Sequence, residues 1–351
     1  MRLLIATDAW HPQINGVVRS LEAMAAHAPA QGAAVSFVTP RGFNTLPMPG
    51  YPEIRMALAT PGQVSRRIDA LAPDWVHIAT EGPIGLAARA ACLAAGRPFT
   101  TSYHTRFPEY LAARAPVPES WSYAALRRFH RAGRACMVGT PSLARELEAR
   151  GFTGLVPWTR GVDTALFRPR SHACLRGQRP VFLCVGRLAV EKNVAAFLAL
   201  DLPGTKVVVG DGPARADLER IDPRARFLGA LTGEALARAY AAADVFVFPS
   251  LTDTFGLVLL EALASGLPVA AHPVTGPLDV VGDTGCGVLD RDLREACLAA
   301  LDVDRARCRE RALLFSWEES ARQFFGNIRA AAAPQARRGS RDSPLASSSA
   351  R

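Results

Sequence analysis

The sequence lacks long hydrophobic runs, paired cysteines and abundant aromatic side chains. Its 351 residues contain no uninterrupted apolar stretch of the roughly 18 residues that a membrane-spanning helix needs, so we expect no such helix. The seven cysteines include no C-x-x-C pair, which argues against a disulfide scaffold or a zinc module and fits a reducing compartment. Aromatic residues make up 7%, and no zinc-finger or aromatic RNA-binding pattern is present, so we expect no nucleic acid partner.

Lysine is also scarce. The chain has only Lys192 and Lys206 against 39 arginines, a ratio that we attribute mostly to the base composition of the genome. The lysine ammonium group is compact, whereas the arginine guanidinium group is a planar fork, so the two are not interchangeable at a binding site. A position that keeps lysine in this chain is therefore a candidate for a specific role.

The net charge of +9 is unevenly distributed along the chain. Residues 1–170 carry 19 basic and 11 acidic side chains, a net charge of +8, whereas residues 171–329 carry −2 and residues 330–351 carry +3. The densest basic segment comprises Arg127, Arg128, Arg131 and Arg134. At helical spacing this segment is either an ordinary solvated helix face or a peripheral contact with an anionic membrane surface.

The N-terminal half predicts alternating strands and helices. Short apolar strands are separated by alanine-rich helical segments, a pattern that is typical of a parallel sheet covered on both faces. The predicted strands are Arg2–Ala6, Ala34–Val38, Trp75–Ile78 and Pro98–Ser102. We expect one α/β domain over residues 1–168.

The alternation thins at Arg168–Arg179, which we interpret as a linker, and then starts again. The strands predicted after it are Val181–Val185, Lys206–Val209, Arg226–Leu228, Val245–Phe248 and Val269–Ala271. We therefore predict a second doubly wound domain over residues 180–315, facing the first across a cleft, with ligands at the carboxyl ends of the strands. An amphipathic helix over 316–330 is expected to pack back on the first domain, and the tail 331–351 is expected to be disordered.

The segment Gly186–Asn193 (GRLAVEKN) follows a predicted strand directly and is predicted to open a helix. It places Arg187 and Lys192 five residues apart, and two cations at a strand end and helix start suit a diphosphate group. An ordinary solvated helix start is the alternative interpretation.

The segment Pro249–Gly266 (PSLTDTFGLVLLEALASG) carries two carboxylates, Asp253 in a loop and Glu261 in an otherwise apolar helix. A carboxylate among leucines is costly unless it is paired or binds a ligand, and its oxygens would suit a ribose diol. The backbone amides at the start of this helix suit a phosphate, and they belong to Phe255, Gly256 and Leu257.

Three further strand ends carry candidate residues. Gly16, after the first strand, would let an anionic ligand approach the backbone closely, and the alternative is a structural turn. His104 follows the strand Pro98–Ser102, where it either faces the cleft or is structural. Asp211 lies in a turn after the strand Lys206–Val209, and an ordinary turn is the alternative there.

Together these segments resemble the retaining, nucleotide-sugar-dependent glycosyltransferases of family 4, also called group 1. The resemblance spans about residues 1–330 and rests on Asn15–Gly16, Tyr103–Thr105, 187–193, 210–213, 227–229, 249–269 and Trp317–Glu318. It implies the GT-B fold, in which two Rossmann-like domains face each other across a cleft.

The resemblance also implies roles for single residues. Arg187 and Lys192 would hold the donor diphosphate and stabilise its leaving charge. Glu261 would hold the ribose, and His104 would face the reacting sugar carbon. The family has glutamate at both ends of a seven-residue spacer, whereas this chain has the shorter Asp253 at the first end, so its contact with the sugar hydroxyls would differ. The other donor contacts would come from Gly16, Asp211, Phe227, Leu228, Phe255, Gly256 and Leu257.

Enzymes of this type need no obligatory metal or other cofactor, because basic side chains stabilise the leaving group. The stretch Asp290–Asp292 (DRD) resembles the metal motif of the other glycosyltransferase fold. It precedes a predicted helix, however, and we interpret it as a helix cap rather than a metal site.

The resemblance implies transfer of a hexose from a nucleotide sugar to a lipid or glycan acceptor, with mannose from GDP-mannose as the first candidate. The opening segment and Pro249–Gly266 look closest to bacterial GDP-mannose-dependent α-mannosyltransferases and glycolipid glycosyltransferases. Alternatives are a UDP-sugar-dependent glycolipid synthase moving a glucosyl or sulfoquinovosyl group to diacylglycerol, a sugar-nucleotide epimerase or hydrolase, and a noncatalytic binding protein. A lipid acceptor fits the basic first half, and with it a cytoplasmic enzyme that is peripheral on the inner face of the membrane.

Overall fold

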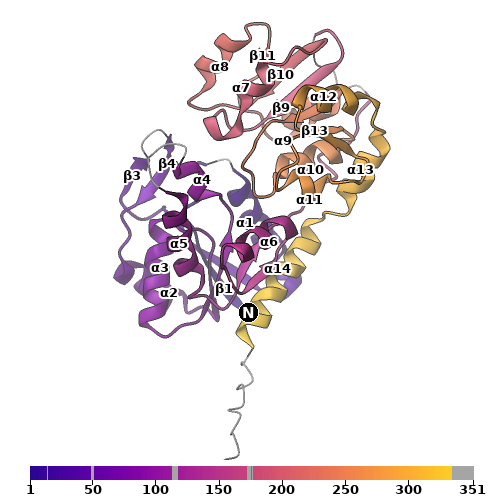
Figure 1. The fold of residues 1–351 in the computed structure, drawn as a ribbon. Helices are drawn as coiled ribbons and strands as arrows, with labels where there is room; N and C mark the ends of the chain where they lie inside the picture. Colours follow the sequence, from indigo (N-terminus) through magenta and orange to yellow (C-terminus); the bar gives the residue numbers. More distant parts are fainter. Residues whose placement is uncertain (14, 49–50, 113–117, 172–174, 176, 334–351) are drawn as a thin grey trace, which may run out of the picture.

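The computed structural model consists of two α/β domains joined by a crossover and by the last helix (Figure 1). It describes residues 1–333 except 14, 49–50, 113–117, 172–174 and 176. The tail that we expected to be disordered therefore lies outside the described residues, apart from 331–333. Of these, Ala331 and Ala332 still belong to the last helix, so the expected start of the tail was two residues too early.

The first domain is built on a six-stranded parallel sheet with the order β2-β1-β5-β6-β7-β8. Successive strand side chains point to opposite faces, and in β1 (Arg2–Ala6) both faces are buried. Leu3 and Ile5 pack in one cluster, whereas Leu4 and Ala6 pack in the other. This two-sided burial is the reason that the strand reads as an uninterrupted apolar run.

The other elements of the first domain follow the alternation that the sequence predicts. Its remaining strands are β2 (Ala34–Val38), β5 (Trp75–Ile78), β6 (Phe99–Tyr103), β7 (Cys136–Val138) and β8 (Leu155–Pro157), with the hairpin β3 (Thr45–Met48) and β4 (Tyr51–Ala57). Its helices are α1 (Gly16–His27), η1 (Pro29–Gln31), α2 (Pro61–Leu71), α3 (Pro83–Ala94), α4 (Phe107–Ala112), α5 (Glu119–His130) and α6 (Pro141–Ala149).

The second domain repeats the design with a six-stranded parallel sheet of order β11-β10-β9-β12-β13-β14. Its strands are β9 (Val181–Val185), β10 (Thr205–Val209), β11 (Arg226–Phe227), β12 (Val245–Phe248), β13 (Val269–Ala271) and β14 (Gly287–Leu289). Its helices are η2 (Val190–Lys192), α7 (Val194–Leu198), α8 (Arg215–Ile221), α9 (Gly233–Ala242), α10 (Leu257–Ala264), α11 (Pro277–Val280), α12 (Leu293–Ala299), η3 (Ala300–Asp302) and α13 (Arg305–Leu313).

The predicted strands agree closely with the observed ones. Six of the nine have the predicted bounds, and the other three differ by one residue at one or both ends. The prediction missed β7, β8 and β14, which are only three residues long, and the hairpin β3–β4. Strands this short carry too few residues to show a period in the sequence.

The crossover between the domains starts earlier than expected. Val162 and Phe167 are buried in the core of the second domain, although the first domain was expected to extend to residue 168. Arg309 fixes this segment, because its guanidinium group donates to the carbonyl oxygens of Thr164 and Phe167 at 2.9 and 2.7 Å. The packing of the first domain therefore ends before Val162.

The last helix, α14 (Trp317–Ala332), leaves the second domain and packs on the first (Figure 1). Ser316 caps it by accepting a hydrogen bond from the Glu319 amide at 3.0 Å. Phe324 and Phe325 are fully buried beside the β1 side chains of Leu3 and Ile5. The two domains thus share a continuous connection in addition to the crossover. No helix among the described residues combines the length and apolar character needed to cross a membrane.

Candidate active site

The carboxyl ends of β9 and β10 carry two of the motif loops, and these loops touch. The Leu188 amide donates to the Asp211 carbonyl oxygen at 2.9 Å. Gly210 has a φ of 146°, and a Cβ there would lie 1.8 Å from the Gly186 carbonyl oxygen. Only glycine fits this close approach, so the GRL and GDGP segments form one surface.

Lys192 sits at the end of a short 3-10 helix rather than in the helix that the sequence predicts. The turn η2 ends at Lys192, and Asn193 adopts a left-handed conformation with φ 51° before α7 begins. Asparagine tolerates this conformation better than most residues. Its side-chain amide donates to the Pro249 carbonyl oxygen at 3.1 Å, which ties the GRLAVEKN segment to the loop after β12.

This connection brings Lys192 to Asp253. The lysine Nζ donates to Asp253 Oδ2 at 2.6 Å, and Asp253 Oδ1 accepts the Thr254 amide at 3.0 Å. Burial raises the pKa of the Asp253 carboxyl, but the lysine charge and the backbone amides outweigh burial and leave the pKa lowered. Asp253 is therefore ionised. Arg187, the other predicted clamp residue, pairs with Glu191 at 3.1 Å.

Glu261 is a buried carboxylate on α10 with two partners. Tyr240 donates its hydroxyl to Glu261 Oε2 at 3.0 Å, and Arg19, from α1 of the first domain, pairs with Oε1. Burial raises the pKa of the Glu261 carboxyl, and the Arg19 charge opposes that shift. The carboxylate thus has a counter-ion from the first domain. The helix that carries it starts after Gly256, which has a φ of 82° and provides no side-chain cap.

The start of α1 faces the start of α10. Asn15 caps α1 by accepting the amides of Val17 and Val18 at 3.0 Å each. A Cβ on Gly16 would lie 3.4 Å from the Leu257 side chain of the opposite domain. The predicted Gly16 and Leu257 positions therefore meet at the contact between the two domains.

His104 is buried on the first-domain side of the cleft. The Arg160 guanidinium donates to His104 Nδ1 at 3.1 Å, so Nδ1 is an acceptor and Nε2 carries the proton. No described residue accepts that proton, which leaves a buried donor without a partner. Burial and the Arg160 charge lower the pKa of the imidazole well below its usual value. His104 is thus a neutral hydrogen-bond donor held by Arg160.

The remaining predicted donor residues occupy the other strand ends. Asp211 is exposed and accepts the Gly212 amide at 2.8 Å. Phe227 and Leu228 are half-buried where β11 ends, next to β10. The Phe255 side chain is buried against Phe315, so only its backbone can meet a ligand.

The DRD stretch is a helix cap, as the sequence predicts. The carboxylate of Asp292 accepts the amides of Arg294 and Glu295 at the start of α12. Within the described part of the chain, no group of three or more histidine, cysteine, aspartate or glutamate side chains is placed to hold a metal ion.

Sequence reasoning missed four residues that support the site, namely Arg19, Thr254, Arg160 and Tyr240. Only Arg19 had a detectable signal, because it follows Gly16 by about one turn of a predicted helix. The other three act through contacts distant in sequence, which no local pattern reveals.

Comparison with known families matches both halves of the chain. Residues 14–166 match the model described as Glycosyltransferase Family 4, and residues 179–303 match Glycosyl transferases group 1. A GDP-mannose-dependent alpha-mannosyltransferase of Mycobacterium tuberculosis is 31% identical over 82% of this chain and 83% of its own length. Sulfoquinovosyl transferase SQD2 of Arabidopsis thaliana is 34% identical over 68% of this chain, which spans 50% of that protein.

Solved structures show the same fold at lower identity. A sucrose-phosphate synthase from Thermosynechococcus elongatus aligns with a TM-score of 0.76 at 20% identity, covering 94% of this chain and 98% of that one. Anabaena HepE in complex with UDP and glucose aligns with a TM-score of 0.70 at 15% identity, covering 94% and 100%. The two domains thus form a GT-B fold, and the chain belongs to the group 1 glycosyltransferases of family 4.

Proposed function

We propose that this glycosyltransferase moves a hexose, with retention of configuration, from a nucleoside diphosphate sugar to a lipid or glycan acceptor. The observation that carries the proposal is the arrangement around α10. The Lys192–Asp253 pair and Glu261 lie on the second domain, and Gly16 and His104 face them from the first. In this proposal a cation, a buried carboxylate and a neutral hydrogen-bond donor surround the donor sugar between the two domains.

The donor would bind mainly to the second domain. Glu261 would accept hydrogen bonds from the ribose diol, because a carboxylate has lone pairs beyond those used by its two present partners. Lys192 and Arg187 would hold the diphosphate together with the amides at the uncapped start of α10. Phe227 and Leu228 would border the base, and Asp211 would lie at the rim.

Transfer would begin with an exchange of partners at Lys192. When the diphosphate takes up the lysine charge, Asp253 is released to accept the sugar hydroxyls. The acceptor hydroxyl oxygen would bond to the anomeric carbon as the sugar–phosphate bond breaks, and its proton would pass to an oxygen of the leaving diphosphate. Lys192 and Arg187 would stabilise the negative charge that develops on that diphosphate. His104 Nε2–H would donate to the sugar or the acceptor. We propose that these cations supply the stabilisation that a metal provides in other transferases.

Several relatives support GDP-mannose as the donor. Relatives named GDP-mannose-dependent alpha-mannosyltransferases match 82% to 88% of this chain. The second candidate is a UDP-sugar glycolipid synthase. Its support comes from SQD2 and from an alpha-monoglucosyldiacylglycerol synthase of Streptococcus pneumoniae that is 27% identical over 86% of this chain.

Nucleoside diphosphate release distinguishes these functions. The enzyme should be given GDP-mannose, UDP-glucose or UDP-sulfoquinovose, each with and without diacylglycerol and glycolipid acceptors. Acceptor-dependent GDP release identifies a mannosyltransferase, and acceptor-dependent UDP release identifies the glycolipid synthase. Turnover without an acceptor indicates an epimerase or hydrolase. Anomeric coupling in the product tests retention.

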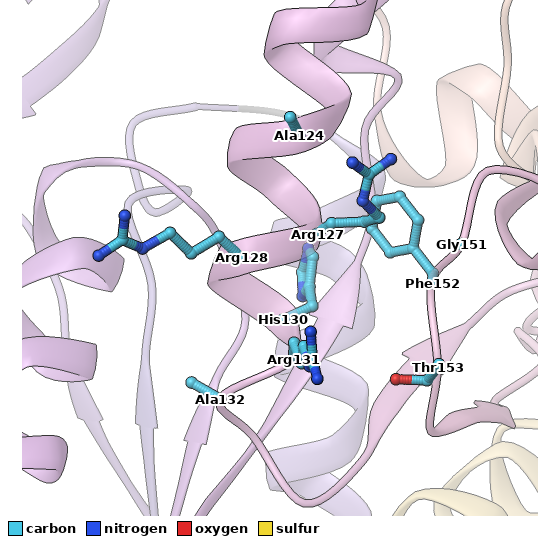
Figure 2. A pocket seen from close by; sticks show the side chains of 9 residues that line it. All are labelled: Ala124, Arg127, Arg128, His130, Arg131, Ala132, Gly151, Phe152 and Thr153. Atoms are coloured by element: carbon cyan, nitrogen blue, oxygen red, sulfur yellow. The ribbon is translucent and has the colours of Figure 1, made fainter.

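The basic segment of the first domain is the proposed contact with an anionic membrane. It does not form one helix face, because α5 ends at His130 and the last two arginines follow it. A cavity of about 400 Å³ is present here (Figure 2). Its lining residues are Ala124, Arg127, Arg128, His130, Arg131, Ala132, Gly151, Phe152 and Thr153.

This cavity lies at the amino edge of the first sheet, because α5 precedes β7 and the strands are parallel. The cleft lies at the opposite, carboxyl edge. We therefore propose that the segment tethers the peripheral enzyme to anionic headgroups and does not itself select the acceptor. Cytoplasmic placement on the inner face of the membrane is part of the same proposal.

A further inference from the structure

We propose that Thr254 is a positioning residue that aligns the donor half of the site with His104. The proposal rests on the proposed function, since it assigns a step in the same transfer reaction. Its basis is one hydrogen bond across the cleft: the Thr254 hydroxyl donates to the His104 carbonyl oxygen at 2.7 Å.

On the second-domain side, Thr254 is fixed to the sugar-binding carboxylate. Its amide donates to Asp253 Oδ1 at 3.0 Å, and Asp253 Oδ2 accepts from Lys192 Nζ at 2.6 Å. A displacement of Thr254 relative to the first domain therefore displaces the groups that would hold the diphosphate and the sugar.

On the first-domain side, the same bond fixes the backbone of His104. The imidazole is held separately by Arg160, and its ring centroid lies 5.4 Å from that of Trp158. Because both the backbone and the imidazole of His104 are held, its Nε2–H group points in one fixed direction. Thr254 thus completes a chain of hydrogen bonds from Lys192 to Arg160 through the residues that would touch the donor sugar.

Other hydrogen bonds between the two domains do not connect the proposed donor site to His104. Arg106 donates to the Thr275 hydroxyl at 2.9 Å, and the Ser142 amide donates to Asp279 at 3.2 Å. Neither contact involves a residue of the proposed donor or sugar site. The Arg19–Glu261 pair reaches the ribose carboxylate, not the sugar end. Thr275 is half-buried like Thr254, so removal of the Thr275 hydroxyl is a matched control for the loss of any interdomain hydrogen bond.

Three variants test the proposal in the full-length enzyme: Thr254→Val, Thr254→Ser and Thr275→Val. Valine keeps the shape of threonine but removes the hydroxyl, whereas serine keeps the hydroxyl. We expect Thr254→Val to lower kcat about three- to tenfold, the range that corresponds to the loss of one hydrogen bond. The Kd for GDP or UDP without acceptor should stay within about twofold, because the diphosphate contacts lie within the second domain. Thr254→Ser and Thr275→Val should keep kcat within about twofold.

Several outcomes would overturn the assignment. A normal kcat in Thr254→Val would show that Thr254 does not position the site. If Thr254→Ser loses as much kcat as Thr254→Val, the hydroxyl is not the cause of the loss. An equal loss in Thr275→Val shows that any interdomain bond has this effect. A parallel loss of nucleotide affinity in Thr254→Val makes Thr254 part of the phosphate loop instead.

Hydrogen exchange tests the same link without relying on turnover. Thr254→Val should raise amide exchange in residues 103–105, and Thr275→Val should leave it unchanged. Unchanged exchange in Thr254→Val contradicts the link even if the enzyme is active. Absence of acceptor-dependent release in the wild-type enzyme, by contrast, contradicts the proposed function and not the link.

Discussion

Lys192 and Asp253 form an ion pair between two strand-end segments of the second domain, with 2.6 Å between Nζ and Oδ2. The pair keeps the pKa of the aspartate lowered even though burial alone would raise it. Asp253 is therefore held in its charged form, where the proposed mechanism needs it. The donor diphosphate must compete with Asp253 for the lysine, so the two residues should respond differently to substitution.

Asp253→Asn should separate nucleotide binding from transfer. With its partner neutralised, Lys192 is available to the diphosphate, so free GDP or UDP should bind at least as tightly as in the wild type. Transfer should fall at least about tenfold, because the contact of a carboxylate with the sugar hydroxyls is lost. Asp217→Asn, whose side chain is 73% exposed and lies outside the proposed site, serves as the control. Isothermal titration with the nucleotide and a transfer assay give the two readouts. Weaker nucleotide binding with normal transfer would refute this role.

Arg19 and Glu261 should be energetically coupled. Arg19→Gln leaves a buried carboxylate with Tyr240 as its remaining described side-chain partner, so the free energy of unfolding should fall by about 1–3 kcal/mol. In a double-mutant cycle with Glu261→Gln, the coupling should be about 1 kcal/mol or more. Urea unfolding measures the free energy of unfolding of the wild type, the two single variants and the double variant.

The control for this cycle is the surface pair Arg220–Asp217, whose side chains are 76% and 73% exposed. Exposed pairs contribute little, so its coupling should be below about 1 kcal/mol and smaller than that of Arg19–Glu261. Purely additive effects at Arg19 and Glu261 would show that the contact between the domains is not maintained in solution.

Buried His77 should make the folded state acid-sensitive. Burial and the charge of Arg160 lower the pKa of His77 to about 3, below the 6.5 of an unperturbed imidazole. Below about pH 6.5 the unfolded chain therefore binds a proton that the folded chain does not, and stability falls as the pH falls. The decrease in the free energy of unfolding between pH 6.0 and pH 5.0 should be about 1 kcal/mol smaller in His77→Asn than in the wild type. Urea unfolding at the two pH values checks this, and equal losses would contradict the shift.

The basic segment should bind anionic vesicles in a salt-dependent manner. Flotation with phosphatidylglycerol vesicles should recover the protein at low salt, and recovery should fall as salt screens the charges. Arg128→Gln with Arg131→Gln should reduce recovery more than Arg220→Gln with Arg224→Gln, although both pairs remove two charges from exposed positions. If no protein floats at low salt, or both double variants lose equally, the tethering proposal fails.

Local pattern was sufficient for nine of the twelve strands in the two parallel sheets described. Strands such as β9 and β12 are buried on both faces and therefore appear as apolar runs whose ends are sharp. Glu261 was recognisable because a carboxylate within an apolar helix is costly unless it is paired or binds a ligand. Asp253 was recognisable through its position in the family's paired-carboxylate pattern. The cap at Asp292 followed from its place before a helix.

The features that could not be predicted from the sequence depend on contacts between distant segments. The helix expected at Lys192 is interrupted by Asn193, whose side chain bonds to Pro249 more than 50 residues away. The counter-ion of Glu261 comes from the other domain, and the early crossover at Val162 reflects packing in the second core. Such contacts leave no periodic trace in the sequence, so they become visible only in the fold.

The most direct test of the account is nucleoside diphosphate release by the wild type and by Lys192→Ala, with and without acceptor. We predict release that requires the acceptor in the wild type. In Lys192→Ala we predict a fall of about 100-fold or more, because the leaving charge loses a stabilising cation. The variant should remain folded, with a lowered melting temperature because Asp253 loses its counter-ion. Equal release without acceptor, or near-normal turnover in the variant, would contradict the central claim that Lys192 acts on the donor diphosphate of a transferase.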